Sequence, residues 1–309
     1  MLKYLVILLD DSSVSFCHYE AGKEKRLISP DDLKTAILFA MKENLNVQIV
    51  WPDYELPQEY KDIIATVDHT NIVPLSLTSD ADIVVADAGC AASIPDGATV
   101  VARLTLEQIL NDADVLMPLL RKAVRVNAVV VDADRFADSD IEAYRKALDI
   151  LCTATAAEYA SGHSVQLNLL TDRLMLDSMN NCNAGDEWLA VAPDGCLYPC
   201  PAFYYNGGMS VGSLTGGPAV KNAQLYRLDH APICRKCDAW HCRRCVWLNR
   251  RLTLEVNTPG RQQCVMAHLE REASRRLNTL LREKGYDLAV KEIKELDYLD
   301  PFDVVIKDN

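Results

Sequence analysis

The sequence predicts an α/β protein with a parallel open sheet or a partial (β/α) barrel, followed by a small cysteine-rich region and a C-terminal helix. Three observations predict this. Short apolar runs alternate with amphipathic segments up to about residue 178, cysteines cluster after that point, and helical periodicity returns near the end. We therefore expect an α/β domain over residues 1–178 and a cysteine-rich domain with a helical extension over residues 179–309.

The expected strands are rich in valine, isoleucine and leucine, as strands covered on both faces should be. They are YLVILLD, VQIVW, ADIVVAD, ATVVARL, AVVVDAD and VQLNLLT. The helices between them have visible start signals. Ser29 can cap a helix that begins at Pro30, Thr105 and Gln108 fit a capping box, and a third helix starts near Asp138. This alternation predicts parallel βα units with right-handed crossovers.

Composition narrows the class of protein. The chain has 309 residues, of which 49% are hydrophobic and 25% charged, so it can bury a sizeable core. A net charge of -12 argues against a nucleic-acid partner or an anionic membrane surface. No apolar run is long enough to cross a bilayer, so we expect no membrane association.

The N-terminal run LKYLVILLDD is a buried strand in this interpretation, because it ends in two aspartates and lacks a small-residue cleavage site. With 11 cysteines and no export signal, the reducing cytoplasm is the expected compartment. Clustered thiols in that compartment indicate metal or redox chemistry.

Eight cysteines lie in the second region, which is enough for two sets of four. Four thiolates saturate either a tetrahedral zinc ion or a 4Fe-4S cluster. The two CxxC units in CRKCDAWHCRRC are separated only by DAWH, which makes it awkward for all four sulfurs to reach one small ion. We therefore expect two separate centres formed by Cys182, Cys196, Cys200, Cys234, Cys237, Cys242, Cys245 and Cys264.

A hairpin is predicted at Asp194 and Gly195, between the apolar runs WLAVA and CLYPC. On a regular strand, Cys196 and Cys200 would face the same side about 13 Å apart. That separation is large for one compact cluster. Cys196 can join Cys200 only if Pro199 and Pro201 bend the strand.

The order of these residues resembles the SPASM domain, a C-terminal extension of radical S-adenosylmethionine enzymes that modify peptides. The pattern is Cys182, twelve residues, Gly195, four residues, Cys200, a four-cysteine run and a lone Cys264. The usual run of the family is C-x2-C-x5-C-x3-C, whereas this chain has C-x2-C-x4-C-x2-C. The resemblance implies two auxiliary 4Fe-4S clusters. One would be held by Cys182, Cys200 and Cys245 with Cys196 as candidate fourth ligand, and the other by Cys234, Cys237, Cys242 and Cys264.

The CxxxCxxC loop of radical S-adenosylmethionine enzymes is missing after the first strand. The segment there is SSVSFCHYEAG, and placing Cys17 in the middle of the motif puts Ser13 and Glu20 at the other positions. Cys90 lies far along the chain and Cys152 falls on a helical stripe, so neither replaces them. We therefore expect no reductive cleavage of S-adenosylmethionine and do not expect it as a cofactor.

The phrases LLDDSSVSFCHYE and PDYELP, with the cysteine pattern behind them, resemble the CXXX repeat peptide maturase family over essentially the whole chain. This resemblance implies a ribosomally made precursor peptide with cysteine at every fourth residue, and a separate radical enzyme as a second partner. The chain would be an accessory maturation protein whose clusters pass electrons or bind the peptide. A non-catalytic scaffold stabilised by zinc, or a peptide-binding protein, remains the alternative.

The other candidate residues are expected to have structural roles or to lie at the surface. Cys17, His18 and Tyr19 are expected in an ordinary loop, and His241 is expected to support the cysteines or lie at the surface. Trp240 and Trp247 are expected to shield the clusters. Exposure to solvent is expected for each of Arg235, Arg243, Arg244, Arg250 and Arg251, with hydrogen bonds to cluster sulfurs as the alternative. Helix caps are expected for Asp132, Asp134 and Asp172.

Overall fold

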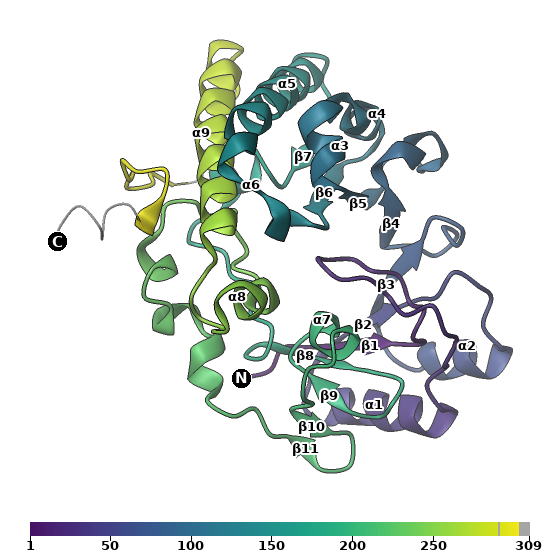
Figure 1. Ribbon diagram of the computed structural model, residues 1–309. Helices are drawn as coiled ribbons and strands as arrows, with labels where there is room; N and C mark the ends of the chain where they lie inside the picture. The colour runs from purple at the N-terminus through teal and green to yellow at the C-terminus, as the bar shows by residue number, and fades with distance from the viewer. Residues whose placement is uncertain (290, 303–309) are drawn as a thin grey trace. The chain divides into compact units, whose positions relative to one another are not determined.

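Parallel strands alternate with helices in the computed structural model, which describes residues 1–289 and 291–302 (Figure 1). The chain forms two compact units. The first consists of Met1–Val85 and Asn183–His230, and the second consists of Ala86–Cys182 with the described residues from Ala231 onward. Each unit is therefore built from two separate stretches of chain, and the cysteine-rich half of the sequence contributes to both.

The sheet of the first unit is centred on β1 (Tyr4–Leu8), whose last four residues are buried. This strand pairs in parallel with β2 (Asn46–Val50) on one side and with β8 (Trp188–Val191) on the other. The order is β4-β3-β2-β1-β8-β9. It is completed by β3 (His69–Pro74), β4 (Ile83–Asp87) and the antiparallel β9 (Leu197–Tyr198).

Helix α1 (Pro30–Lys42) starts where the sequence predicts, since the Ser29 hydroxyl accepts a hydrogen bond of 3.0 Å from the Asp32 amide. Its buried Leu33 and Ile37 pack in one apolar core with Ile7 of β1. The rest of this unit comprises α2 (Gln58–Ile64), α7 (Pro201–Tyr205), a ribbon of β10 (Gly212–Ser213) and β11 (Gly217–Pro218), and 3₁₀ turns at Ala223–Tyr226 and Leu228–His230.

The second unit contains the parallel strands β5 (Thr99–Leu104), β6 (Arg125–Val130) and β7 (Gln166–Leu167), in the order β7-β6-β5. Helix α3 (Leu106–Asn111) has the predicted capping box of Thr105 and Gln108. Its other helices are α4 (Met117–Lys122), α5 (Ile141–Ala160), α6 (Asp172–Met175), α8 (Val246–Thr253) and α9 (Arg261–Glu283). Short 3₁₀ segments lie at Ala88–Ser93, Ala113–Leu116, Ala133–Arg135, Asp138–Asp140 and Cys234–Lys236.

Helix α9 packs along α5, and the two run side by side in Figure 1. The helical spacing near the end of the chain places Val265, Leu269, Leu277, Leu280 and Leu281 on one stripe of α9, and all of them except Leu280 are buried. The Cys152 thiol of α5 donates to the Ala273 carbonyl oxygen across this contact at 3.2 Å. Burial raises the pKa of Cys152 to about 12, so this thiol is a structural group and not a nucleophile.

The predicted α/β class is confirmed, and the sheet is open. In the part of the chain that the structure describes, β9 ends the strand order of the first unit and β7 ends that of the second. The sequence interpretation missed β3, because His69, Thr70 and Asn71 give its first half no apolar run. None of the described helices combines the length and hydropathy needed to cross a bilayer.

A buried cluster of ion pairs joins α9 to the turn before residue 240. Asp238 is 1% exposed, and its two carboxylate oxygens accept hydrogen bonds of 2.9 Å from Arg271 and Arg275. The Leu296 amide also donates to it at 2.9 Å. Burial by itself raises the pKa of Asp238, but the amide and the guanidinium groups outweigh it and hold the pKa below its ordinary value of 3.8.

Replacing this carboxylate should destabilise the second unit strongly. Asp238→Ala leaves the buried Arg271 charge without its partner, and we expect a loss of about 3–5 kcal/mol in the free energy of unfolding. Asp229→Ala, which removes an exposed ion pair with Arg227, should cost less than about 1 kcal/mol. Urea denaturation followed by circular dichroism measures both, and equal effects would contradict the structural role of Asp238.

The same ion pairs predict how stability depends on pH. Because the folded-state pKa is depressed, the contribution of Asp238 is complete above pH 3.8 and is lost as the pH falls through the lower folded value.

Candidate metal centre

Four cysteines of the second unit line one small cavity: Cys234, Cys237, Cys242 and Cys264. The first three come from the turn that precedes α8, and Cys264 comes from the first turn of α9. Arg244, His268 and Tyr298 line the same cavity. The structure therefore brings together the four residues that the SPASM-like pattern assigns to one cluster.

Local hydrogen bonds shape the cysteine turn. The Cys237 amide donates to the Cys234 carbonyl oxygen at 3.0 Å, and the Cys242 amide donates to the Ala239 carbonyl oxygen at 3.0 Å. The Ala239 amide donates to the Cys237 sulfur at 3.4 Å. Two successive tight turns thus place three thiols within nine residues, with one sulfur already accepting a backbone hydrogen bond of the kind that stabilises thiolate ligands.

Helix α9 supplies the fourth thiol. Gly260 caps this helix, and a Cβ atom at that position would lie 2.4 Å from Leu252 Cδ1, so the absence of a side chain lets the two segments approach closely. Cys264 is buried four residues later. Its neighbour Val265 lies on the stripe that packs in the core, so the helix position of Cys264 is fixed by packing.

Burial raises the pKa of each thiol in the cavity. That of Cys234 rises to about 12. The pKa of Cys264 is raised by burial first and then by the other three thiols of the cavity, because a thiolate is disfavoured beside other ionisable sulfurs. Thiols with such pKa values stay protonated at neutral pH unless a metal displaces the protons.

A buried positive charge accompanies the thiols. The side chain of Arg244 is 0% exposed, and its Nε donates to Asn181 Oδ1 at 2.8 Å. Burial raises the pKa of Cys234, and the Arg244 guanidinium lowers it again by favouring the thiolate. The Arg244 backbone lies at a φ of 41°, in the left-handed region, and its amide donates to the Cys242 sulfur. Arg244 therefore contributes both charge and a backbone donor.

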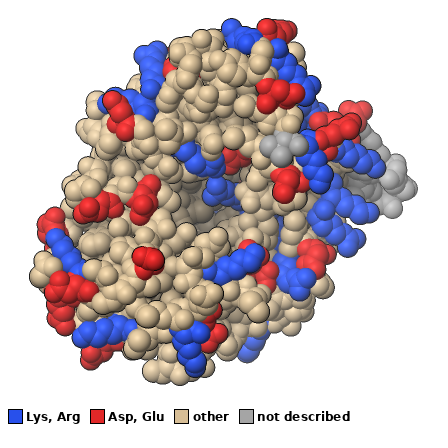
Figure 2. Space-filling view, turned by 180° about the vertical axis from the view of Figure 1, so that it is seen from behind, with Lys and Arg blue, Asp and Glu red and all other residues tan. Residues whose placement is uncertain are grey.

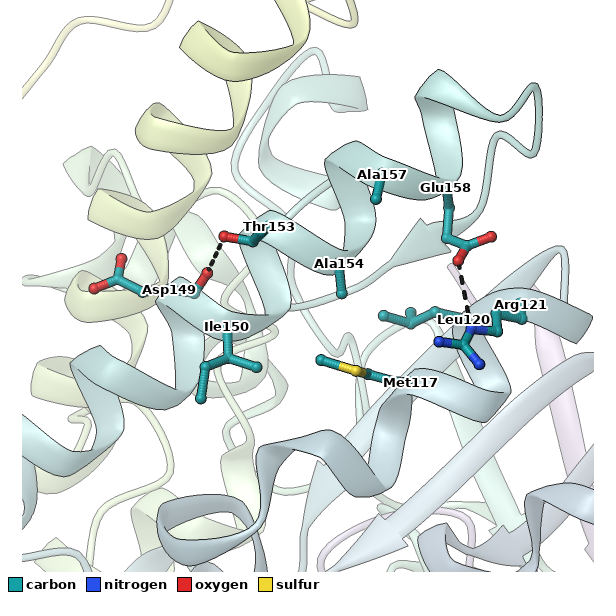
Figure 3. Close-up of a pocket in the computed structure, with 9 residues that line it drawn as sticks. All are labelled: Met117, Leu120, Arg121, Asp149, Ile150, Thr153, Ala154, Ala157 and Glu158. Carbon is teal, nitrogen blue, oxygen red and sulfur yellow. Dashed lines mark hydrogen bonds and ion pairs between the residues drawn. The ribbon is translucent and has the colours of Figure 1, made fainter.

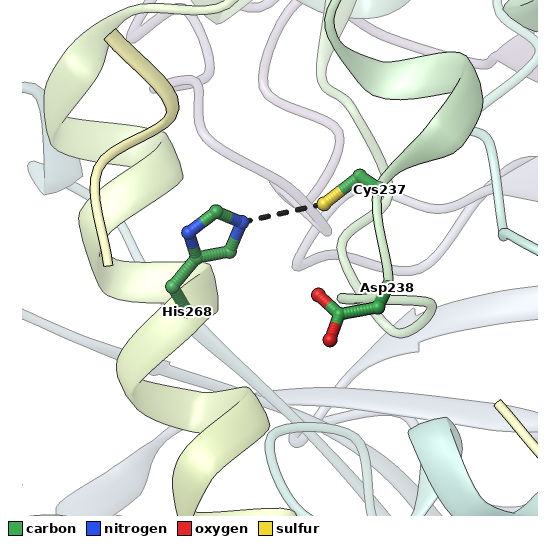
Figure 4. Close-up of side chains that lie close together, drawn as sticks. All are labelled: Cys237, Asp238 and His268. Atoms are coloured by element: carbon green, nitrogen blue, oxygen red, sulfur yellow. Dashed lines mark hydrogen bonds between the residues drawn. The ribbon is translucent and has the colours of Figure 1, made fainter. Parts of the chain in front are cut away.

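His268 faces the same cavity from α9, one turn beyond Cys264 (Figure 4). Its Nε2 lies 3.3 Å from the Cys237 sulfur. Its Nδ1 donates to the Leu299 carbonyl oxygen. Burial, and then the Arg271 charge, lower the pKa of His268 to about 4, so the imidazole is neutral at pH 7. The sequence interpretation missed His268, although its spacing of four residues from Cys264 on a helix was visible.

The other predicted set is divided between the two units, with Cys182 and Cys245 in the second unit and Cys196 and Cys200 in the first. In the second unit, the Cys182 amide donates to the Arg243 carbonyl oxygen at 2.6 Å, which places Cys182 beside the segment that leads to Cys245. In the first unit, Cys196 forms a bridge with Ser213, and Cys200 is buried. The expectation that Cys196 and Cys200 share a regular strand is wrong, because β9 ends at Tyr198 and Cys200 caps helix α7.

Several neighbouring residues have structural roles. His241 is buried, not at the surface, and its Nε2 lies 3.0 Å from Glu270. The expectation of solvent exposure is wrong for Arg244, which is 0% exposed. Arg271 of α9 is also buried, at 1% exposed. Asp132 caps α3 by accepting from the Leu106 amide at 2.6 Å, as predicted. The other two aspartates form ion pairs instead, Asp134 with Arg251 and Asp172 with Arg125.

Trp240 and Trp247 each have a positively charged side chain over the ring. Trp247 is 7% exposed with Arg251 above its ring, and Lys291 lies over the ring of Trp240. Neither tryptophan lines the thiol cavity. The Arg243 guanidinium donates to Asn127 at 3.4 Å, and that of Arg250 donates to the Leu254 carbonyl oxygen at the end of α8. Arg235 is exposed.

The loop after β1 is held by its own polar contacts. Ser13 is 0% exposed, its hydroxyl donates to the Val50 carbonyl oxygen at 2.9 Å, and it accepts from the Asp10 amide at 3.0 Å. The Tyr19 ring stacks on the Tyr205 ring, with the two ring centroids 5.3 Å apart. Of the three positions expected for a CxxxCxxC loop, only Cys17 carries a thiol. These residues do not fit a three-thiolate cluster site.

A larger cavity lies between α4 and α5 (Figure 3). Its walls are mainly apolar, and its charged groups include Arg121 and Glu158, which lie 3.9 Å apart. The residues that line it carry no thiol or imidazole: Met117, Leu120, Arg121, Asp149, Ile150, Thr153, Ala154, Ala157 and Glu158. Of these two cavities, the one lined by the four cysteines is therefore the one that offers thiol and imidazole groups.

Charged side chains are interspersed on the face of the molecule drawn in Figure 2, where blue and red groups alternate.

No model of a protein family and no curated protein matches the sequence. Solved structures do match the fold. A histidine-tagged anSMEcpe with bound AdoMet superposes with a TM-score of 0.62 at 11% identity, covering 93% of this chain and 100% of that one. "Native anSMEcpe with bound AdoMet and Cp18Cys peptide" gives 0.61 at 12% identity, with 92% and 100% covered. The complex with the Kp18Cys peptide gives 0.60 at 12% identity, with 91% and 99% covered. Over nearly its whole length, the chain has the fold of anSMEcpe.

Proposed function

We propose that the chain is an accessory protein in the maturation of a ribosomally made peptide with cysteine at every fourth residue. It would bind two auxiliary 4Fe-4S clusters, for electron transfer or peptide binding, without reductive cleavage of S-adenosylmethionine. The observation that carries this proposal is the cavity lined by Cys234, Cys237, Cys242 and Cys264. The chain has 11 cysteines, and thiols that bind metal suit the reducing cytoplasm as the place of action.

The spacing of the sulfurs favours an iron-sulfur cluster over a single zinc ion. Among the described residues, the only three potential ligand atoms within 4.8 Å of one another belong to Cys237, Asp238 and His268, so no three cavity sulfurs lie that close. A tetrahedral zinc ion with Zn–S distances of about 2.3 Å holds its sulfurs roughly 3.8 Å apart. A cube of four irons and four sulfides spreads its four cysteine ligands more widely.

Charge supports the same assignment. A cluster bound by four thiolates is anionic, and Arg244 provides a buried cation in the cavity wall. When bound, such a cluster supplies one-electron transfer. The residues of this chain would bind it, exclude water through the buried position of Cys264 and Cys234, and offset its charge.

The family resemblance assigns the second cluster to Cys182, Cys200 and Cys245, with Cys196 as candidate fourth ligand, and this assignment stays a prediction. The backbone bond between Cys182 and Arg243 supports part of this set, because it brings Cys182 to within two residues of Cys245 along the neighbouring segment. Residues 179–309 would then form the cluster-binding region of the protein, with residue 290 and residues 303–309 outside the described part.

A partner peptide is supported by the family resemblance and by the fold, since a solved structure with this fold contains a bound Cp18Cys peptide. The loop after β1 has one thiol where three would be needed, so the radical step would belong to a separate enzyme. In this arrangement the chain presents the peptide or exchanges electrons during the reaction.

Iron analysis tests the clusters. We expect anaerobically purified protein to contain about eight irons and about eight sulfides per chain. Cys264→Ala should remove about four of each, because it deletes one ligand of the cavity. Cys90→Ala, which changes an exposed thiol outside the proposed sites, is the control and should keep the full content. Colourless protein that contains zinc and no sulfide would instead support a structural scaffold.

An assay of S-adenosylmethionine cleavage tests the missing catalytic loop. With dithionite as reductant, reconstituted protein should form no 5′-deoxyadenosine above a protein-free control, because Ser13 and Glu20 cannot replace two thiolates. A known radical enzyme in the same buffer serves as the positive control. Multiple turnovers by this chain would overturn the proposed accessory role.

A binding assay tests the peptide partner. We expect a fluorescently labelled precursor peptide with the four-residue cysteine repeat to bind saturably in anaerobic anisotropy measurements. A peptide of the same composition in shuffled order should bind at least about tenfold more weakly, a difference of about 1.4 kcal/mol. Equal affinity for both peptides would contradict recognition of the precursor.

A further inference from the structure

The thiol cavity contains five potential iron ligands, one more than a 4Fe-4S cluster needs. Four are the sulfurs of Cys234, Cys237, Cys242 and Cys264, and the fifth is the imidazole of His268. A cluster with one terminal ligand on each iron uses four of these groups. One of the five groups is therefore not needed as a ligand. The distances between the groups indicate which two of them compete for the same iron.

His268 is oriented as a metal-binding histidine. Its side chain is 1% exposed, and Nδ1 donates its proton to the Leu299 carbonyl oxygen. This bond fixes the ring and leaves the lone pair of Nε2 directed toward Cys237, as Figure 4 shows. Metal-binding histidines almost always hold their second nitrogen in this way.

The carboxylate of Asp238 also lies near these atoms, but its two oxygens already accept hydrogen bonds. Its oxygens accept from Arg271, Arg275 and the Leu296 amide. A carboxylate held by two guanidinium groups has little remaining capacity to bind a metal. The group formed by Cys237, Asp238 and His268 thus offers two available donors, one sulfur and one nitrogen.

These two donors are too close to serve different irons independently. Nε2 lies 3.3 Å from the Cys237 sulfur. When Cys237 binds iron it loses its proton, and the lone pair of Nε2 then faces an anionic sulfur instead of a hydrogen-bond donor. When Nε2 binds the iron instead, the iron–sulfur bond of Cys237 breaks, the released sulfur takes up a proton from solvent, and the repulsion is removed.

We propose that Cys237 and His268 are alternative ligands of the same iron in the cluster of the thiol cavity. This inference rests on the proposed function, because it requires a cluster at that place. It adds a fifth residue to the site and gives the cluster two ligand sets, one with four sulfurs and one with three sulfurs and a nitrogen. Histidine ligation raises the reduction potential of iron-sulfur centres, so the second form would accept an electron more readily.

The test uses three variants of the full chain, purified anaerobically: Cys237→Ala, His268→Ala and the double variant. Cys237→Ala should keep the iron content of the wild-type protein, because His268 takes over. After reduction with dithionite, which makes the otherwise diamagnetic cluster paramagnetic, its electron paramagnetic resonance spectrum should show hyperfine coupling to nitrogen that changes on labelling histidine with ¹⁵N, and its reduction potential should be higher. His268→Ala should keep its iron without such coupling, and the double variant should lose about four irons.

Cys264→Ala provides the comparison for complete ligand loss, because it deletes a sulfur of the same cavity from α9. A Cys237→Ala protein that loses as much iron as Cys264→Ala, or that keeps its iron without nitrogen coupling, overturns the inference and leaves the proposed function intact. Wild-type protein without iron and sulfide overturns both. If Cys237→Ala does not fold, as judged by circular dichroism, Cys237→Val fills the volume of the thiol without a donor atom and gives the same test.

Discussion

The ion pairs of Asp238 fix the geometry on which the thiol cavity depends. Asp238 directly follows Cys237, and Arg271 lies seven residues beyond Cys264, two turns further along α9. A buried carboxylate bound by two guanidinium groups tolerates little displacement, since any shift leaves a desolvated charge without its partner. The turn and the helix are therefore held in one relation to each other, and so are the sulfurs they carry.

The same interactions extend to the segment near the end of the described chain. The Leu296 amide donates to Asp238, the Tyr298 carbonyl oxygen accepts from Arg271, and the Leu299 carbonyl oxygen accepts from His268. This segment thus sets the orientation of the imidazole as well as covering the cavity beside Tyr298. Loss of Asp238 would therefore disturb the ligands indirectly, through the backbone that holds them.

Much of the fold follows from local sequence signals. Ser29, Thr105 and the apolar stripe of α9 predict helices where the structure has them, because capping and periodicity act over a few residues. The short spacings between cysteines likewise indicate which thiols a single turn can bring together. The sequence analysis considers Pro201 as a bend in a strand, yet Pro201 starts α7, because proline also suits the first position of a helix.

The remaining parts of the site depend on contacts that are distant in sequence. Arg271 pairs with Asp238 33 residues away, and periodicity alone cannot show that a charged residue of α9 is buried by such a partner. The role of His268 depends on its contacts with Leu299 and Cys237, each 31 residues away. The burial of Arg244 depends in the same way on packing around the cavity.

Buried cysteines alone are weak evidence for a metal centre, because a protonated thiol behaves as a small apolar side chain and is often found in protein cores. Cys152 is such a case, with its thiol bound to a carbonyl oxygen in an apolar contact. The cavity differs because Arg244 brings a desolvated positive charge to four thiols and already favours the thiolate of Cys234. A cation in that place is costly beside neutral thiols and favourable beside an anionic cluster, so the charge of the wall, more than the number of cysteines, argues for a bound metal.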